Sequence, residues 1–208
     1  MIGNVDLVDD VAAAFADLVV REQPRSIALS GGATARRCYE ALAARSGIDW
    51  PSTEVLFGDE RQVPVDDPDS NEGMAREELL DHVAVGRVHS LVELGAPAYD
   101  ALLRGRGGID LVHLGLGPDG HTASLFPGSD ALDEVDRLVV TTAARQPPFV
   151  ERLTFTLPAI ARARHVVFTV EGEKKRAVWR RVVAGDDLPA TRVAADVVTW
   201  LVDRDVAT

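Results

Sequence analysis

Short apolar runs alternate with longer amphipathic stretches along most of this 208-residue chain, and this alternation limits the possible folds more than any other feature. The run at 109–115 is apolar on both faces, which is typical of a strand inside a parallel sheet. Strands separated by helices with short connections predict an α/β fold. We therefore expect a single Rossmann-like domain over residues 1–208, with a mostly parallel sheet and helices on both faces.

The expected elements follow from these patterns. Helices are expected at 8–21, 34–45, 70–83, 98–104 and 172–183. Strands are expected at 26–30, 54–58, 109–115, 138–142, 153–156 and 166–170, while 197–201 is ambiguous. Thr34 and Ser70 are each placed to cap the N-terminus of a helix.

Composition and charge exclude several classes of function. The formal net charge of −11 disfavours nucleic acids and anionic membranes as partners, because both select basic surfaces. No apolar run approaches the length of a membrane span, and the N-terminus is acidic, unlike that of a secretory signal peptide. We therefore expect a cytoplasmic protein. Separately, we expect a monomer or a weak homodimer.

Metal and dinucleotide sites are also disfavoured. Cys38 is the only cysteine, so neither an internal disulfide nor a multi-cysteine zinc site is possible, and we expect its side chain to be buried on a helix. The chain has no HExxH motif, no GxGxxG spacing and no P-loop. We expect it to use no metal and no cofactor.

Four polar motifs each follow an expected strand. They are SGGAT at 30–34, GDER at 58–61, GPDGHT at 117–122 and GEKK at 172–175. In an open parallel sheet, ligands gather outside the carboxyl ends of the strands. The predicted fold would therefore bring these four motifs together.

The first motif has two interpretations that its residues leave open. Gly31 and Gly32 let the backbone approach a ligand, and the amides of a helix N-terminus favour an anion. Ser30 and Thr34 would add hydroxyl donors, which together predict a phosphate site. The alternative is a tight turn in which Thr34 merely caps its helix.

Two further motifs carry candidate catalytic groups. Asp119 and His121 lie in a loop rich in glycine and proline, which suits a general base whose imidazole Asp119 orients. Arg61, close to Asp59, could bind an oxyanion or a phosphate, although acidic loops are usually only solvated surface. His113, inside a strand, is expected to be packed.

Ser124 is disfavoured as a nucleophile, because the chain has no G-x-S-x-G motif.

Several of these motifs resemble the 6-phosphogluconolactonase family. The similar segments are LSGGAT at 29–34, FGDERQVPVDDPDSN at 57–71, GPDGHTASLFPGS at 117–129 and ERLTFTLPAI at 151–160. The resemblance implies the sheet architecture shared with glucosamine-6-phosphate deaminases and ribose-5-phosphate isomerases. It also implies metal-free hydrolysis of 6-phospho-D-glucono-1,5-lactone to 6-phospho-D-gluconate, in the oxidative pentose phosphate pathway.

The resemblance further implies a role for each site residue. His121 would take a proton from the water that attacks the lactone carbonyl, and Asp119 would orient the imidazole. Arg61 would stabilise the oxyanion, and Asp59 would hold the water or a sugar hydroxyl. The phosphate would be bound by Ser30, Gly31, Gly32, Thr34, Arg152 and Lys175, with Lys174 as the alternative to Lys175.

Two other functions stay open on the same fold. One is an aldose-phosphate deaminase or isomerase, and the other is a domain that binds a sugar phosphate without turnover. Deaminases of the family carry a glutamate shortly after the loop histidine, and the matching residue here is Phe126, which favours the lactonase. The segment before Ser26 is shorter than is usual in the family, which predicts that an edge strand is missing.

Overall fold

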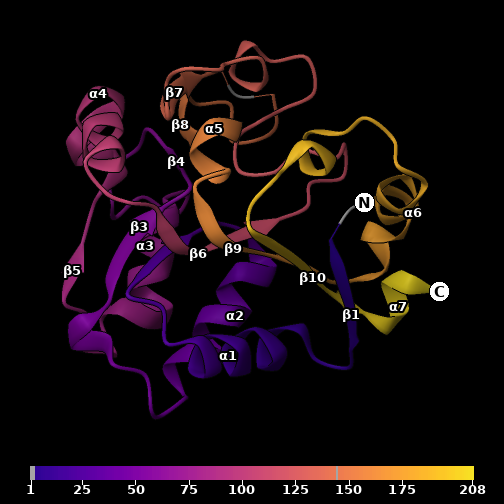
Figure 1. The fold of residues 1–208 in the computed structure, drawn as a ribbon, viewed down its shortest axis with the longest axis horizontal. Helices are drawn as coiled ribbons and strands as arrows, with labels where there is room; N and C mark the ends of the chain where they lie inside the picture. Colours follow the sequence, from indigo (N-terminus) through magenta and orange to yellow (C-terminus); the bar gives the residue numbers. More distant parts are fainter. Residues whose placement is uncertain (1–2, 144) are drawn as a thin grey trace.

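A sheet of seven strands forms the centre of the computed structural model, which describes residues 3–143 and 145–208 (Figure 1). The strand order is β1-β10-β9-β6-β2-β3-β5, and every neighbouring pair is parallel. The strands are β1 (Asn4–Val8), β2 (Ser26–Leu29), β3 (Glu54–Phe57), β5 (Arg87–Val88), β6 (Ile109–Gly115), β9 (Ala163–Val170) and β10 (Val197–Asp203). The predicted α/β class with a mainly parallel sheet is confirmed.

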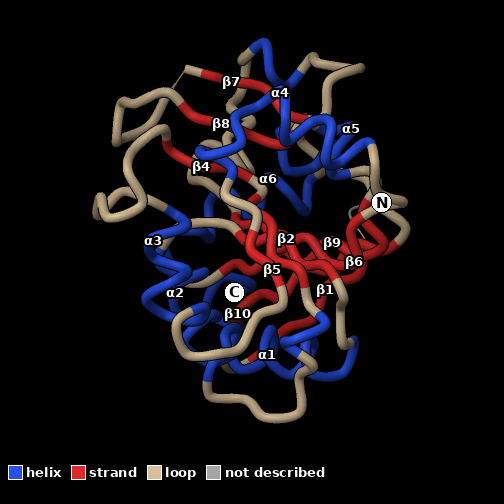
Figure 2. The backbone as a smooth tube through the Cα atoms, turned by 90° about the vertical axis from the view of Figure 1, so that its left-hand side faces the viewer, coloured by secondary structure: helices blue, strands red, loops and turns tan. Residues whose placement is uncertain are grey.

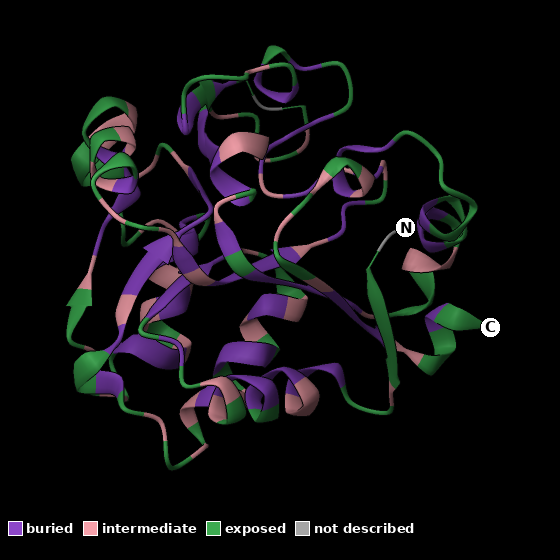
Figure 3. Ribbon diagram, in the orientation of Figure 1, coloured by how far each residue is buried: buried purple, intermediate pink, exposed green. Residues whose placement is uncertain are grey.

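Helices lie on both sides of this sheet (Figure 2). They are α1 (Val11–Glu22), α2 (Ala33–Ala43), α3 (Asn71–Ala75), α4 (Leu91–Arg104), α5 (Leu157–Ile160), α6 (Arg176–Ala184) and α7 (Arg204–Ala207). In α1, the buried residues Val11, Phe15, Leu18 and Val19 repeat at helical spacing. This apolar stripe packs against the sheet. In Figure 3 the buried residues, drawn in purple, lie mainly on the central strands and on the helix faces turned toward them.

A second, antiparallel sheet of three strands was not predicted. It consists of β4 (Asp59–Arg61), β8 (Arg152–Phe155) and β7 (Val139–Thr142), and it stands beside α4 and α5 at the top of Figure 1. Its register pairs Arg61 with Arg152. Two arginines that lie far apart in the sequence are thereby placed side by side.

Two expectations about element ends are wrong. An edge strand does precede α1, because β1 pairs in parallel with β10, although its side chains are largely exposed and give no buried pattern to recognise. Thr34 does not cap α2: the N-cap is Gly32, with φ at 101°, and no side chain caps the helix. Since Thr34 lies inside the first turn, the amides of that turn are left for a ligand.

Other expectations are confirmed or extended. Ser70 caps α3, accepting a hydrogen bond from the amide of Gly73 at 3.0 Å. α4 is longer than the expected 98–104. Gly95 and Pro97 kink the helix, so its first half has no regular helical periodicity from which it could be predicted. The ambiguous segment 197–201 is part of β10. In the part of the chain that the structure describes, no helix has the length and apolarity needed to span a bilayer.

Candidate active site

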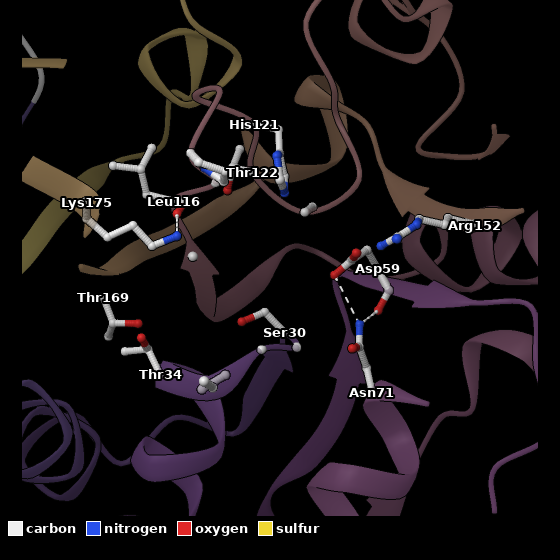
Figure 4. Close-up of a pocket in the computed structure, with 18 of the residues that line it drawn as sticks. Ser30, Thr34, Asp59, Asn71, Leu116, His121, Thr122, Arg152, Thr169 and Lys175 are labelled. Carbon is white, nitrogen blue, oxygen red and sulfur yellow. Dashed lines mark hydrogen bonds between the residues drawn. The ribbon is translucent and has the colours of Figure 1, made fainter. Parts of the chain in front are cut away.

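A cavity of about 210 Å³ opens at the carboxyl ends of the central strands, where β2 and β6 lie side by side (Figure 4). β3 and β5 continue the sheet on the β2 side, and β9 and β10 continue it on the β6 side. Open α/β sheets bind ligands at such a reversal of strand order. All but one of the ten residues predicted for the site line it: Ser30, Gly31, Gly32, Thr34, Asp59, Arg61, His121, Arg152 and Lys175. The tenth, Asp119, does not line the cavity but contacts His121.

The Asp119–His121 pair has the geometry of an oriented general base. His121 Nδ1 lies 2.5 Å from a carboxylate oxygen of Asp119, and Gln146 Nε2 donates to the other oxygen at 3.3 Å. The imidazole points into the cavity in Figure 4, and its side chain is 20% exposed. Because Nδ1 is held by the carboxylate, Nε2 is the nitrogen that can meet a ligand.

Charge and burial support the same arrangement. Burial alone would raise the pKa of Asp119, but the charge of His121 and the hydrogen bonds from it outweigh burial and leave that pKa below its ordinary value. Asp119 therefore stays ionised and fixes the tautomer of the ring. Phe126, which is fully buried, packs against the imidazole with ring centroids 4.7 Å apart.

Gly117 leaves the space that the His121 ring occupies. A Cβ atom at this position would overlap Nδ1 and Cε1 of the imidazole. We expect Gly117→Ala to lower kcat for the reaction proposed below by about 10- to 100-fold, because a base displaced by an ångström loses its alignment. Steady-state kinetics of Gly117→Ala beside Gly107→Ala, where an added Cβ meets nothing, will check this. Equal kcat values for the two variants would contradict it.

Asp59 and Arg61 are held by Asn71, a residue that the sequence did not single out. Asn71 Oδ1 accepts a hydrogen bond from Arg61 Nη1 at 2.6 Å. Its amide nitrogen donates to the Asp59 backbone carbonyl at 3.0 Å and lies 3.4 Å from the Asp59 carboxylate. One side chain at the start of α3 thus fixes both a cation and an anion of the cavity.

Two buried groups support this cluster from behind. Glu60 accepts hydrogen bonds from the amides of Arg61, Asn71 and Glu72 at 2.6–2.8 Å, which fixes the start of α3. Ser124 is fully buried and donates to Asp59 at 2.7 Å. This contact gives Ser124 a structural role, in agreement with the sequence argument against a serine nucleophile.

The loop at residues 30–34 combines close packing with unpaired donors. A Cβ at Gly31 would overlap the Asn71 amide, so this glycine is needed to let Asn71 reach Arg61. Ser30 Oγ and Thr122 Oγ1 are buried and have no hydrogen-bond partner within the described residues. Together with the uncapped first turn of α2, they are donors aimed at a space that a polar ligand would fill.

The two cations predicted to bind the phosphate, Arg152 and Lys175, lie on opposite sides of the cavity (Figure 4). Lys175 Nζ donates to the Leu116 carbonyl at 2.6 Å, and burial lowers its pKa, an effect that Asp119 opposes. Arg152 lies beside Asp59, and its Nη2 donates to the carbonyls of residues 146, 147 and 148 at 3.0–3.3 Å. Burial is the main cause that lowers the pKa of Arg152. The positive charge of the neighbouring Arg61 guanidinium lowers this pKa further.

Three polar side chains that line the cavity were given no role by sequence reasoning. They are Asn71, Thr122 and Thr169. Thr169 lies at the carboxyl end of β9, and Thr122 ends the GPDGHT motif in the loop after β6. These positions are the signal that could have identified them. Asn71 had no such signal, because its importance arises only when the loop folds back onto β4.

Comparison with known proteins identifies the family of this chain. A model of the family described as glucosamine-6-phosphate isomerases/6-phosphogluconolactonase matches residues 5–200. A 6-phosphogluconolactonase from Synechocystis is 40% identical over 200 residues, covering 86% of this chain and 82% of that protein. The chain belongs to this family. A 6-phosphogluconolactonase from Mycobacterium tuberculosis is 35% identical over 206 residues, covering 87% of this chain and 83% of that protein.

Solved structures show the same family fold. A 6-phosphogluconolactonase from Trypanosoma brucei superposes with a TM-score of 0.83 at 28% identity, covering 99% of this chain and 97% of that one. The 6-phosphogluconolactonase from Thermotoga maritima gives a TM-score of 0.83 at 28% identity, covering 97% and 99%. A monomeric glucosamine-6-phosphate deaminase, at 20% identity and a TM-score of 0.80, shares the fold. The fold alone therefore does not distinguish a lactonase from a deaminase.

Proposed function

We propose that this protein hydrolyses 6-phospho-D-glucono-1,5-lactone to 6-phospho-D-gluconate, using water activated by His121. The reaction class is that of its relatives, lactone hydrolysis. The observation that carries the proposal is the His121 imidazole, oriented by Asp119 and directed into a cavity whose opposite side holds the uncapped N-terminus of α2. One end of the cavity thus suits a base and the other an anion.

The phosphate would bind at the loop that follows β2. The first-turn amides of α2 and the unpaired hydroxyl of Ser30 are donors for its oxygens, and Gly32 carries no side chain that would block them. Lys175 borders the same cavity and would supply the charge. The resemblance also assigns Arg152 to the phosphate. Its place beside Arg61 and Asp59 suits the oxygens at the lactone end equally well.

The lactone would be opened between His121 and Arg61. His121 Nε2 takes a proton from water as the water oxygen bonds to the carbonyl carbon. The carbonyl oxygen becomes an oxyanion, which Arg61 stabilises. The bond from this carbon to the ring oxygen then breaks, and the imidazolium returns its proton to that oxygen. Asp59, already held by Ser124 and Asn71, would accept a hydrogen bond from the water or from a sugar hydroxyl.

The contact between Phe126 and His121 favours this reaction over deamination. Phe126 is fully buried and tilted by 47° against the imidazole, and its apolar ring cannot relay a proton as a carboxylate at this position would. A base that needs only to activate water requires no such relay.

A lactone assay tests the proposed function. We expect the protein to hydrolyse 6-phosphogluconolactone well above the spontaneous rate, and to act far more slowly on unphosphorylated gluconolactone. Release of ammonia from glucosamine 6-phosphate without lactone hydrolysis would replace the proposal with a deaminase. Tight binding of 6-phosphogluconate by a protein that turns over neither substrate would replace it with a binding domain.

We expect the reaction to proceed without a metal ion. Within the described residues, no group of three or more histidine, cysteine or acidic side chains could hold one. Dialysis against EDTA should therefore leave kcat and KM within about twofold of their starting values, as measured by the lactone assay. Loss of activity that Mg²⁺ or Zn²⁺ restores would disprove this.

A further inference from the structure

A buried histidine outside the proposed chemistry connects two walls of the cavity. His113, on β6, has no exposed surface, and Phe15 of α1 stacks on its ring with centroids 4.2 Å apart. Its Nδ1 lies 3.1 Å from the hydroxyl of Tyr39, and its Nε2 lies 2.9 Å from Thr169 Oγ1. Each ring nitrogen therefore meets one hydroxyl group.

The ring carries a single hydrogen. Burial lowers the pKa of His113 to about 3, so the imidazole is neutral at physiological pH. A neutral imidazole donates from one nitrogen and accepts at the other. The position of this one hydrogen decides whether the Thr169 hydroxyl donates a hydrogen bond to His113 or accepts one from it.

The contacts of Tyr39 decide where that hydrogen lies. Its hydroxyl accepts a hydrogen bond from the Ser30 amide at 2.7 Å and donates to the Ser30 carbonyl at 3.0 Å. Since the hydroxyl has one hydrogen, it must accept from His113, and the ring hydrogen is on Nδ1. Nε2 is then the acceptor of the Thr169 hydrogen. The opposite tautomer would take the Tyr39 hydrogen away from a buried carbonyl, which is costly.

The Cys38 thiol, also near Thr169, does not compete for this hydrogen. Burial raises the pKa of Cys38 to about 12, so it stays protonated. A neutral thiol is a much weaker acceptor than an imidazole nitrogen. Thr169 therefore presents only lone pairs to the cavity that it lines.

This separates Thr169 from the other buried hydroxyls of the cavity. Ser30 Oγ and Thr122 Oγ1 have no partner within the described residues, so each keeps a hydrogen to give to an anion. Thr169, which is 3% exposed, already donates its hydrogen to His113 Nε2. A phosphate oxygen beside it would place two acceptors together, whereas a sugar hydroxyl would satisfy it.

We propose that Thr169 is a specificity residue that accepts a hydrogen bond from a hydroxyl of the substrate, and that His113 is the residue that positions it by holding its hydrogen. The proposal rests on the proposed function, because the hydroxyl belongs to the phosphorylated sugar acid or its lactone. Thr169 thus helps the cavity to distinguish a polyhydroxylated phosphate from a bare phosphate.

The tautomer is measured directly by ¹⁵N NMR of the imidazole, with His113→Gln used to assign the signals. We expect the Nδ1–H form in the free protein and in its complex with 6-phosphogluconate. The Nε2–H form in either state would overturn the proposal. This measurement does not depend on turnover, so a failed lactone assay and a failed tautomer assignment are distinguishable.

Binding of two probes tests the specificity. Thr169→Val should weaken 6-phosphogluconate binding by about three- to tenfold, the loss of one hydrogen bond, and leave the Kd of inorganic phosphate unchanged. His113→Leu frees the Thr169 hydroxyl to donate, and should reduce the preference for 6-phosphogluconate over phosphate. In the Thr169→Val background it should change that preference no further. Equal weakening of both probes by Thr169→Val, or additive effects of the two substitutions, would refute the proposal.

Discussion

His121→Ala should lower kcat for 6-phosphogluconolactone by about 10²- to 10⁴-fold, the contribution of a well-placed general base. The substitution removes the imidazole that Asp119 orients, but it leaves the α2 N-terminus and Lys175 intact. The affinity for 6-phosphogluconate, measured by calorimetry, should therefore stay within about threefold of the unsubstituted protein. The two measurements separate loss of the base from loss of the binding site.

The matched control is His82→Ala. His82 is exposed, its Nε2 lies 2.8 Å from the Glu77 carbonyl, and it does not line the cavity. Its kcat should match that of the unsubstituted protein. If His121→Ala keeps more than about a tenth of the original kcat, another group activates the water.

Arg61→Gln should produce the second large loss, lowering kcat by about 10²- to 10³-fold through the missing oxyanion donor. Arg61 is held by the Asp69 carbonyl at 2.8 Å and by Asn71 at 2.6 Å, and its Nε has no partner within the described residues. A glutamine is shorter and uncharged, so it cannot reproduce this charge at the same place. Steady-state kinetics corrected for the spontaneous rate will give kcat and KM.

Arg180→Gln is the control for the charge change. Arg180 is an exposed arginine of α6 that does not line the cavity, and its Nη2 donates to the Thr208 carbonyl at 3.3 Å. It should leave both constants unchanged. A rise in KM with an unaltered kcat in Arg61→Gln would show instead that Arg61 binds the ground state, as a phosphate ligand would.

Regular patterns in the sequence predicted the parallel sheet and the location of the site. Buried strands such as β6 have an unbroken apolar pattern, and a polar motif follows each of the strands that border the cavity. The rule that ligands gather at strand ends then suffices to bring Ser30, Asp59 and His121 to one cavity.

The features that were missed depend on contacts between distant segments. β4 begins two residues after β3 and has the sequence DER, so only its pairing with β8 makes it a strand. Asn71 acts by reaching Asp59 and Arg61 across a folded loop. Neither feature has a periodic pattern, and tertiary contacts override local preference in both.

The side-chain directions also lay outside what sequence could show. His113 was expected to be packed, and it is fully buried. Its connection to Thr169 on β9 comes from the parallel register of β6 and β9, which sets His113 opposite Val167, two residues before Thr169. Hydrophobic patterning predicts that such a polar side chain is buried, but it does not predict its hydrogen-bond partners.

The small antiparallel sheet has a consequence for how the protein responds to its ligand. Arg61 and Arg152 belong to that sheet, whereas the loop at 30–34 and Lys175 follow strands of the large one. Each sheet has its own ladder of hydrogen bonds. A substrate that contacts both sheets would stabilise their arrangement. Binding of substrate in the cavity should therefore slow amide hydrogen exchange along β4 and β8.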